Sequence, residues 1–258
     1  MIPEFALRLV CGLSAMWCLA PRRQITSGFF RIQMLLVLGL SVLAVVTAHQ
    51  FPVSDSALTD RVQGGIFAAS LLIAGLSFAG SMAWTLERRR GGAVFAWLIF
   101  GIALLTICGT TICGTTGNMS NSLFKGVQSG LSALSAAWIL GATTAAMLLG
   151  HWYLTATGMA LQPLVNYSRL FGLSVLARIG TEIGSVISQG HSLEGNWTLQ
   201  ILRWGGLLGP LVMAWLTLRI LKYRNTQSAT GVLYAATILV FMGEMAAGLL
   251  GGMQTGGP

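Results

Sequence analysis

Residues 92–113 read GAVFAWLIFGIALLTICGTTIC, a run without any charged side chain that follows Arg88, Arg89 and Arg90. A bilayer core about 30 Å thick is crossed by roughly 20 mostly apolar residues in an α-helix. The stretch is therefore typical of a transmembrane helix whose basic end lies at one membrane surface.

Stretches of the same character recur along the chain, so the sequence predicts an all-α polytopic membrane protein with about eight transmembrane helices. The predicted spans are residues 5–20, 31–49, 64–85, 92–113, 127–149, 168–188, 201–219 and 231–251. The first is short and carries Arg8, which we place near the membrane edge, where a long side chain can reach the headgroups. It does not resemble a signal peptide, because its start is acidic and no small-residue cleavage site follows. Since the connections are short, residues 1–258 are predicted to form a single integral membrane domain.

The composition excludes several other classes of protein. Mean hydropathy is +0.74, and only 9% of residues are charged, whereas soluble domains usually have about 25%. The four cysteines have no CxxC spacing, so neither a structural metal site nor covalently attached haem is expected. The high pI, about 10.1, reflects basic loops beside the membrane, and we therefore expect the lipid bilayer and no nucleic acid as a partner.

Basic residues are concentrated on one side of the predicted membrane protein. The loops after the first, third, fifth and seventh spans, with their flanks, contain Arg22, Arg23, Arg31, Arg88, Arg89, Arg90, Arg169, Arg219, Lys222 and Arg224. Because Lys and Arg are enriched in cytoplasmic loops, these loops are predicted to be cytoplasmic and both termini to lie outside. The expected location is a bacterial inner membrane.

The two halves of the chain, residues 1–118 and 119–258, share short motifs in the same order. The hexapeptide GLSVLA occurs in the second span at 39–44 and again in the sixth span at 172–177. Shorter matches join the first, third and fourth spans to the fifth, seventh and eighth. We therefore predict a four-plus-four internal repeat, forming two parallel four-helix bundles related by an axis along the membrane normal.

Three ionisable residues lie inside predicted spans: Arg178, Glu182 and Glu244. Arg178 and Glu182 are one helical turn apart, the spacing of an ion pair on one helix face. Counted from Arg169 and Gly231, the two carboxylates reach the same depth of about 20 Å. One guanidinium and two carboxylates have a net charge of minus one, so we expect a proton to be shared. The cluster is predicted to be a proton relay or, alternatively, a structural link between helices.

The histidines suggest weaker candidate sites. His151 and Tyr153 follow the fifth span, where aromatic residues usually anchor a helix at the interface. The alternative is contact with a lipid headgroup or a quinone ring, because imidazole and phenol groups can exchange protons with a quinone oxygen. His49 and His191 share the opposite side and are candidate axial ligands of haem b. We do not expect haem b, because His191 lies in a polar loop.

In layout, two four-helix bundles with buried acidic residues are similar to the quinol-handling membrane anchors of the polysulfide-reductase type. The similarity implies an integral subunit of a multisubunit electron-transfer, respiratory-type complex. Its own part would be quinone contact or proton passage, with the redox groups in partner subunits and no catalysis by this chain alone. A structural or assembly subunit and a small proton-coupled transporter are the alternatives.

Overall fold

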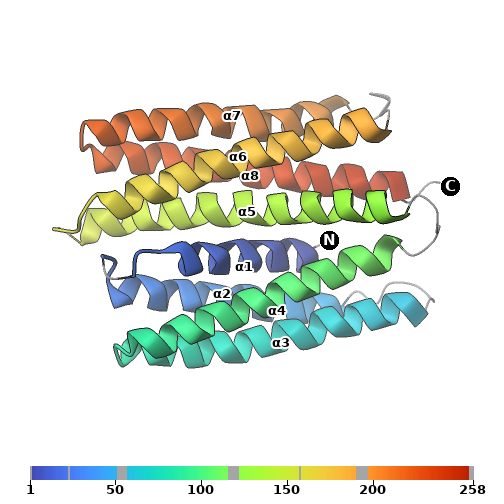
Figure 1. Ribbon diagram of the computed structural model, residues 1–258, viewed down its shortest axis with the longest axis horizontal. Coiled ribbons are helices and arrows are strands. Elements are labelled where there is room, and N and C mark those ends of the chain that lie inside the picture. Colours follow the sequence, from blue (N-terminus) through green and yellow to red (C-terminus); the bar gives the residue numbers. More distant parts are fainter. Residues whose placement is uncertain are drawn as a thin grey trace. The chain divides into compact units, whose positions relative to one another are not determined.

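The computed structural model describes residues 2–22, 24–50, 57–115, 122–156, 158–189 and 197–255. Within these ranges the chain forms eight α-helices (Figure 1). They are α1 (Ile2–Leu19), α2 (Ser27–Gln50), α3 (Ala57–Thr85), α4 (Arg89–Thr115), α5 (Ser122–Thr155), α6 (Gln162–Gln189), α7 (Trp197–Lys222) and α8 (Thr226–Thr255). All eight described helices are long and apolar enough to cross a membrane, which confirms the predicted all-α fold with about eight helices of transmembrane length.

Most helices extend beyond the predicted spans, because polar residues at the membrane surface continue the backbone hydrogen bonding. The largest difference concerns residues 151–164, which the sequence predicts to be a loop. In the structure α5 continues to Thr155 and α6 begins at Gln162. The remaining connection is short, with Gly158 at a φ of 97°, a left-handed conformation that suits glycine.

The other connections at this end of the helices are also tight. Glu87, after α3, and Arg224, after α7, both have left-handed backbones, with φ of 53° and 55°. Asn225 caps α8, because its side-chain oxygen accepts the backbone N–H of Ser228 at 3.0 Å. Each of these turns reverses the chain, so α3 and α4, like α7 and α8, run antiparallel.

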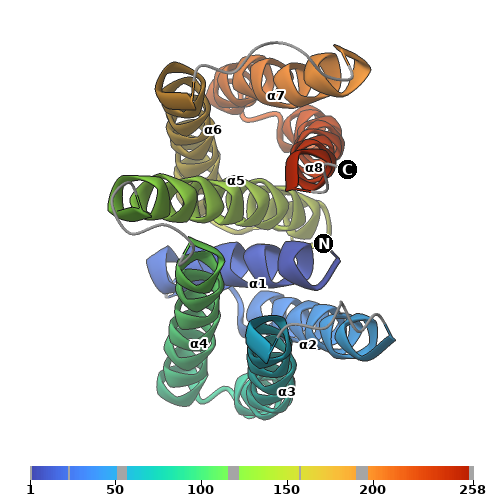
Figure 2. The same cartoon turned by 90° about the vertical axis from the view of Figure 1, so that its right-hand side faces the viewer.

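The chain divides into two compact units, of which the first comprises Met1–Gly141. In this unit α1 contacts α2 and α4, and α3 also contacts α2 and α4, so these four helices form a closed bundle (Figure 2). The first part of α5 packs on α1 where Gly12 meets Gly141, and a Cβ atom at either position would overlap the backbone of the other helix. Glycine is therefore required at this crossing.

The second unit, Ala142–Pro258, contains the rest of α5 with α6, α7 and α8. Here α7 contacts both α6 and α8. The backbones of α7 and α8 touch at Gly206 and Gly243, where a Cβ on Gly243 would lie 2.8 Å from the Cα of Gly206. Glu244, the residue after Gly243, contacts Arg178 of α6.

Candidate functional site

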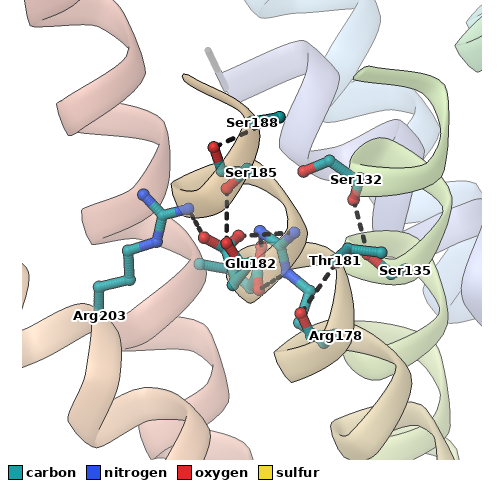
Figure 3. A network of polar contacts seen from close by, with 9 residues as sticks. Ser132, Ser135, Arg178, Thr181, Glu182, Ser185, Ser188 and Arg203 are labelled. Atoms are coloured by element: carbon teal, nitrogen blue, oxygen red, sulfur yellow. Dashed lines mark hydrogen bonds and ion pairs between the residues drawn. The ribbon is translucent and has the colours of Figure 1, made fainter. Parts of the chain in front are cut away.

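The structure brings together the three ionisable residues that the sequence places inside the membrane. Figure 3 shows two of them, Arg178 and Glu182. Arg178 Nη1 lies 2.9 Å from Glu182 Oε1, one turn along α6. The same guanidinium holds Glu244 of α8 with two hydrogen bonds, 2.7 Å from Nε to Oε1 and 3.0 Å from Nη2 to Oε2. All three residues are buried, with exposed fractions of 4%, 3% and 8% for Arg178, Glu182 and Glu244.

A fourth residue, Arg203 of α7, completes this group, which we call the charge network. Its Nη2 contacts the second carboxylate oxygen of Glu182 (Figure 3). Sequence reasoning did not include this residue among the buried charges, because it lies near the start of the predicted span 201–219, where a long side chain can reach the headgroups. Two signals could have found it: Arg203 lies inside the predicted span 201–219, and the three recognised groups lacked one positive charge.

Arg203 also changes the charge count on which the expected shared proton rests. Two arginines and two glutamates have no net charge when all are ionised. Both oxygens of Glu244 accept from Arg178, and the oxygens of Glu182 accept from Arg178 and Arg203. Such charge-assisted hydrogen bonds are strong and directional. The network thus alternates in sign from α7 through α6 to α8 and needs no extra proton for neutrality.

The network lies nearer to one end of α6, α7 and α8 than to the other. At 1.5 Å per residue, Glu182 is about 10 Å from the end of α6 at Gln189, and Arg203 about 9 Å from the start of α7. Arg178 and Glu244 are each about 16 Å from the ends of their helices. The prediction counted depth from Arg169, whereas α6 begins seven residues earlier. Arg203 is therefore the member nearest the surface, and its side chain is 22% exposed.

His151 and Tyr153 lie in the last turns of α5 and do not form one site. Tyr153 is buried, and its hydroxyl donates to the backbone carbonyl of Ala160 across the α5–α6 connection. His151 is exposed, and its ring forms a T-shaped contact with Tyr234 of α8, with 6.2 Å between the ring centroids. Tyr153 is thus part of the packing of the connection, while His151 remains at the surface.

A cavity of about 420 Å³ lies beside Tyr153, between the α5–α6 and α7–α8 connections. Its lining is mainly apolar, with one cation, Arg224, and two hydroxyls, those of Tyr153 and Thr226, as polar groups. The lining residues are Tyr153, Ala156, Gly158, Met159, Ala160, Leu161, Arg224 and Thr226. Sites for small molecules typically have such a composition and a volume of about 300–1,000 Å³.

The candidate haem ligands lie at the limits of the described chain. His191 is outside the described residues, and His49 is in the last turn of α2, where only the backbone is described. Haem ligation by these histidines therefore stays a hypothesis from the sequence. Among the side chains that the structure describes, no group of three or more His, Cys, Asp or Glu residues could hold a metal ion.

Comparison with protein-family models, curated proteins and solved structures found no match to this chain. Its function must therefore be argued from the charge network and the cavity themselves.

Proposed function

We propose that this chain is an integral membrane subunit of a multisubunit electron-transfer complex, to which it contributes a quinone contact. The cavity beside Tyr153 carries the proposal. It is large enough for a substituted benzoquinone ring, and it lies at the basic end of the helices, where the α5–α6 and α7–α8 connections meet. Quinone heads reach protein sites from this interfacial depth, because their polar oxygens favour the membrane surface.

The lining of the cavity suits the two parts of a quinone. Ala156, Met159 and Leu161 offer apolar contact to the ring, and Arg224 and Thr226 offer donors to a carbonyl oxygen. The Tyr153 hydroxyl already donates to Ala160, so we assign Tyr153 to shaping the wall rather than to proton exchange. Exposed His151 lies outside the lining and is assigned to the membrane interface.

The charge network favours a second candidate function, a structural or assembly subunit without a site of its own. Proton passage needs a group that gains and loses a proton, whereas every carboxylate oxygen of Glu182 and Glu244 is held by a guanidinium. The same argument speaks against a proton-coupled transporter that uses these residues. Within either candidate function, the network fixes α6, α7 and α8 relative to one another.

The remaining parts of the proposal concern topology and setting. We propose that both termini lie outside the cytoplasm of a bacterial inner membrane, and that other subunits and lipid, but no nucleic acid, are the partners. The closed α1–α4 bundle supports the four-plus-four arrangement of two bundles. The boundary between compact units falls within α5 at Gly141, whereas the sequence motifs divide the repeat halves at residue 118. The repeat itself therefore stays a prediction.

The test is isolation of the complex from its native membrane in mild detergent, followed by quinone extraction and labelling with a photoreactive azidoquinone. We expect redox subunits and quinone to copurify and the label to attach to the α5–α6 connection. Ala156→Trp should fill the cavity and weaken labelling at least about tenfold, equivalent to about 1.4 kcal/mol. The matched control is Leu154→Trp, because Leu154 is 43% exposed and lies outside the lining.

A large assembly without redox subunits or quinone would support the structural candidate instead. Equal labelling of the Ala156→Trp and Leu154→Trp variants would show that the cavity does not bind the quinone, whatever the complex contains.

A further inference from the structure

The interior of the α1–α4 bundle contains polar side chains that the described protein leaves unpaired. They are Gln33 and Ser41 on α2 and Ser70, Ser77 and Trp84 on α3. Each is at most 2% exposed, and each has a nitrogen or oxygen atom without a hydrogen-bond partner among the described residues. Neither lipid nor apolar side chains can hydrogen-bond such atoms, so leaving them unpaired is costly in a membrane.

The three serines differ from other buried serines of this protein. Ser14 and Ser174 donate to carbonyls of their own helices, at 2.8 Å to Val10 and 2.7 Å to Phe171. Serine in an apolar helix commonly satisfies itself in this way. The hydroxyls of Ser41, Ser70 and Ser77 make no such bond, so they are turned away from the nearest carbonyls of α2 and α3.

Gln33 and Trp84 present donors whose orientation is fixed. Trp17 donates its ring N–H to Gln33 Oε1, which directs the Gln33 NH₂ group away from Trp17. Trp84 stacks on Phe30 with ring centroids 4.5 Å apart, and its indole occupies the space that a Cβ at position 92 would need. Both unpaired groups, Gln33 Nε2 and Trp84 Nε1, can only donate, so each requires an acceptor.

The unpaired groups are spread along the bundle rather than gathered at one point. α2 starts and α3 ends at the same end of the bundle, as the Phe30–Trp84 stack shows. From that end, at 1.5 Å per residue, Trp84 lies at about 2 Å, Gln33 at about 9 Å and Ser77 at about 12 Å. Ser41 and Ser70 lie at about 21 and 22 Å. The five unpaired groups therefore extend over about 20 Å along the bundle, roughly two thirds of the thickness of the hydrocarbon core of a bilayer.

We propose that the interior of the α1–α4 bundle holds a file of bound water molecules that connects these five side chains. Water is the ligand whose chemistry fits, because it accepts from the Gln33 amide and the Trp84 indole and both donates to and accepts from serine hydroxyls. It needs space for only a single probe sphere, and buried waters typically make two to four such hydrogen bonds. The inference is independent of the proposed quinone contact.

The first test is X-ray radiolysis of the purified full-length protein in detergent equilibrated with H₂¹⁸O. Hydroxyl radicals formed from bound water oxidise reactive side chains beside it, even where bulk water has no access. We expect Met34 and Trp84, which are 1% and 2% exposed, to incorporate ¹⁸O. The controls are Tyr167 and Phe171, reactive aromatic residues of the second unit that are fully buried. Labelling of Met34 and Trp84 no faster than that of these controls would overturn the proposal.

The second test uses the direction of a change in Tm to decide whether Ser41, Ser70 and Ser77 form hydrogen bonds to bound water. If the bundle is dry, the triple variant S41A/S70A/S77A loses three unpaired hydroxyls and its Tm rises. If water is bound, the variant loses hydrogen bonds, its Tm falls, and ¹⁸O labelling of Met34 decreases by at least half. Ser14→Ala is the control, because Ser14 is equally buried but paired within α1, and we expect unchanged Met34 labelling. A rise in the Tm of the triple variant would refute the water file. Should the triple variant fail to fold, the radiolysis of the unaltered protein decides alone.

Discussion

Replacing Arg178 by leucine removes the cation that both glutamates of the charge network share. Glu244 then loses both of its hydrogen bonds in the described structure, whereas Glu182 keeps its contact with Arg203. The damage is therefore concentrated on one buried carboxylate, Glu244, which is 8% exposed.

The expected cost follows from this loss of partner. Removing one member of a buried ion pair typically destabilises a protein by about 3–5 kcal/mol, because the other charge stays buried without compensation. With about 2–4 °C of Tm per kcal/mol for a chain of this size, Arg178→Leu should lower Tm by roughly 6–20 °C. Deleting a complete pair can be almost neutral. R178L/E244L should therefore be milder than Arg178→Leu, because the Glu182–Arg203 pair survives.

A second double variant makes the test specific to the observed pairing. R178L/E182L breaks the described ion pairs of both Glu244 and Arg203, whereas R178L/E244L keeps the Glu182–Arg203 pair, so R178L/E182L should be the less stable of the two double variants. The four-residue spacing of Arg178 and Glu182 alone predicts the opposite order of stability. It pairs these two residues and would make R178L/E182L the milder double variant. Thermal unfolding in detergent, followed by circular dichroism, measures all three variants. The control is Arg169→Leu, an exposed position on α6, with an expected change within about 0.5 kcal/mol. If R178L/E182L is the more stable double variant, the reasoning fails.

Two further predictions concern packing and topology. Gly206→Ala should destabilise by about 1–3 kcal/mol, because its Cβ would lie 2.8 Å from the Leu239 carbonyl oxygen. Gly205→Ala, with open space around its Cβ, should gain up to about 1 kcal/mol of helix propensity; equal Tm values would contradict the α7–α8 crossing. Reporter domains fused after Arg90 or Arg224 should be cytoplasmic, and a C-terminal fusion should not, so a cytoplasmic C-terminal reporter would reverse the proposed orientation.

The spans and the Arg178–Glu182 pair could be predicted because both depend on local spacing. Twenty apolar residues set a span, and two residues four apart share a helix face. Glu244 was placed beside them by counting residues along two helices that run the same way. Arg203 could not be placed by these rules, because whether an arginine near a helix end turns outward or inward depends on how the helix is rotated in the bundle.

The unpaired groups of α2 and α3 show a different limit of sequence reasoning. Serine in an apolar helix is unremarkable in a sequence, because it can usually donate to its own backbone. Only the structure distinguishes Ser14, which does so, from Ser77, which does not. The burial of Tyr153 could not be predicted for a related reason: hydropathy shows where the apolar residues stop, while α5 continues beyond them and buries the phenol ring.

The order of helices along the chain matches the order in which the charges can be neutralised during membrane insertion. A nascent α6 contains its own pair, because Arg178 and Glu182 are one turn apart on the same helix. α7 follows and brings Arg203 to the free oxygen of Glu182. α8 would insert Glu244 against a cost of about 2.5–3.5 kcal/mol for a charge at a helix centre, but its partner Arg178 is already in the bilayer when α8 is synthesised. Each new charge of the network would thus meet an opposite charge on an earlier helix, so none of its four members would enter lipid without a partner.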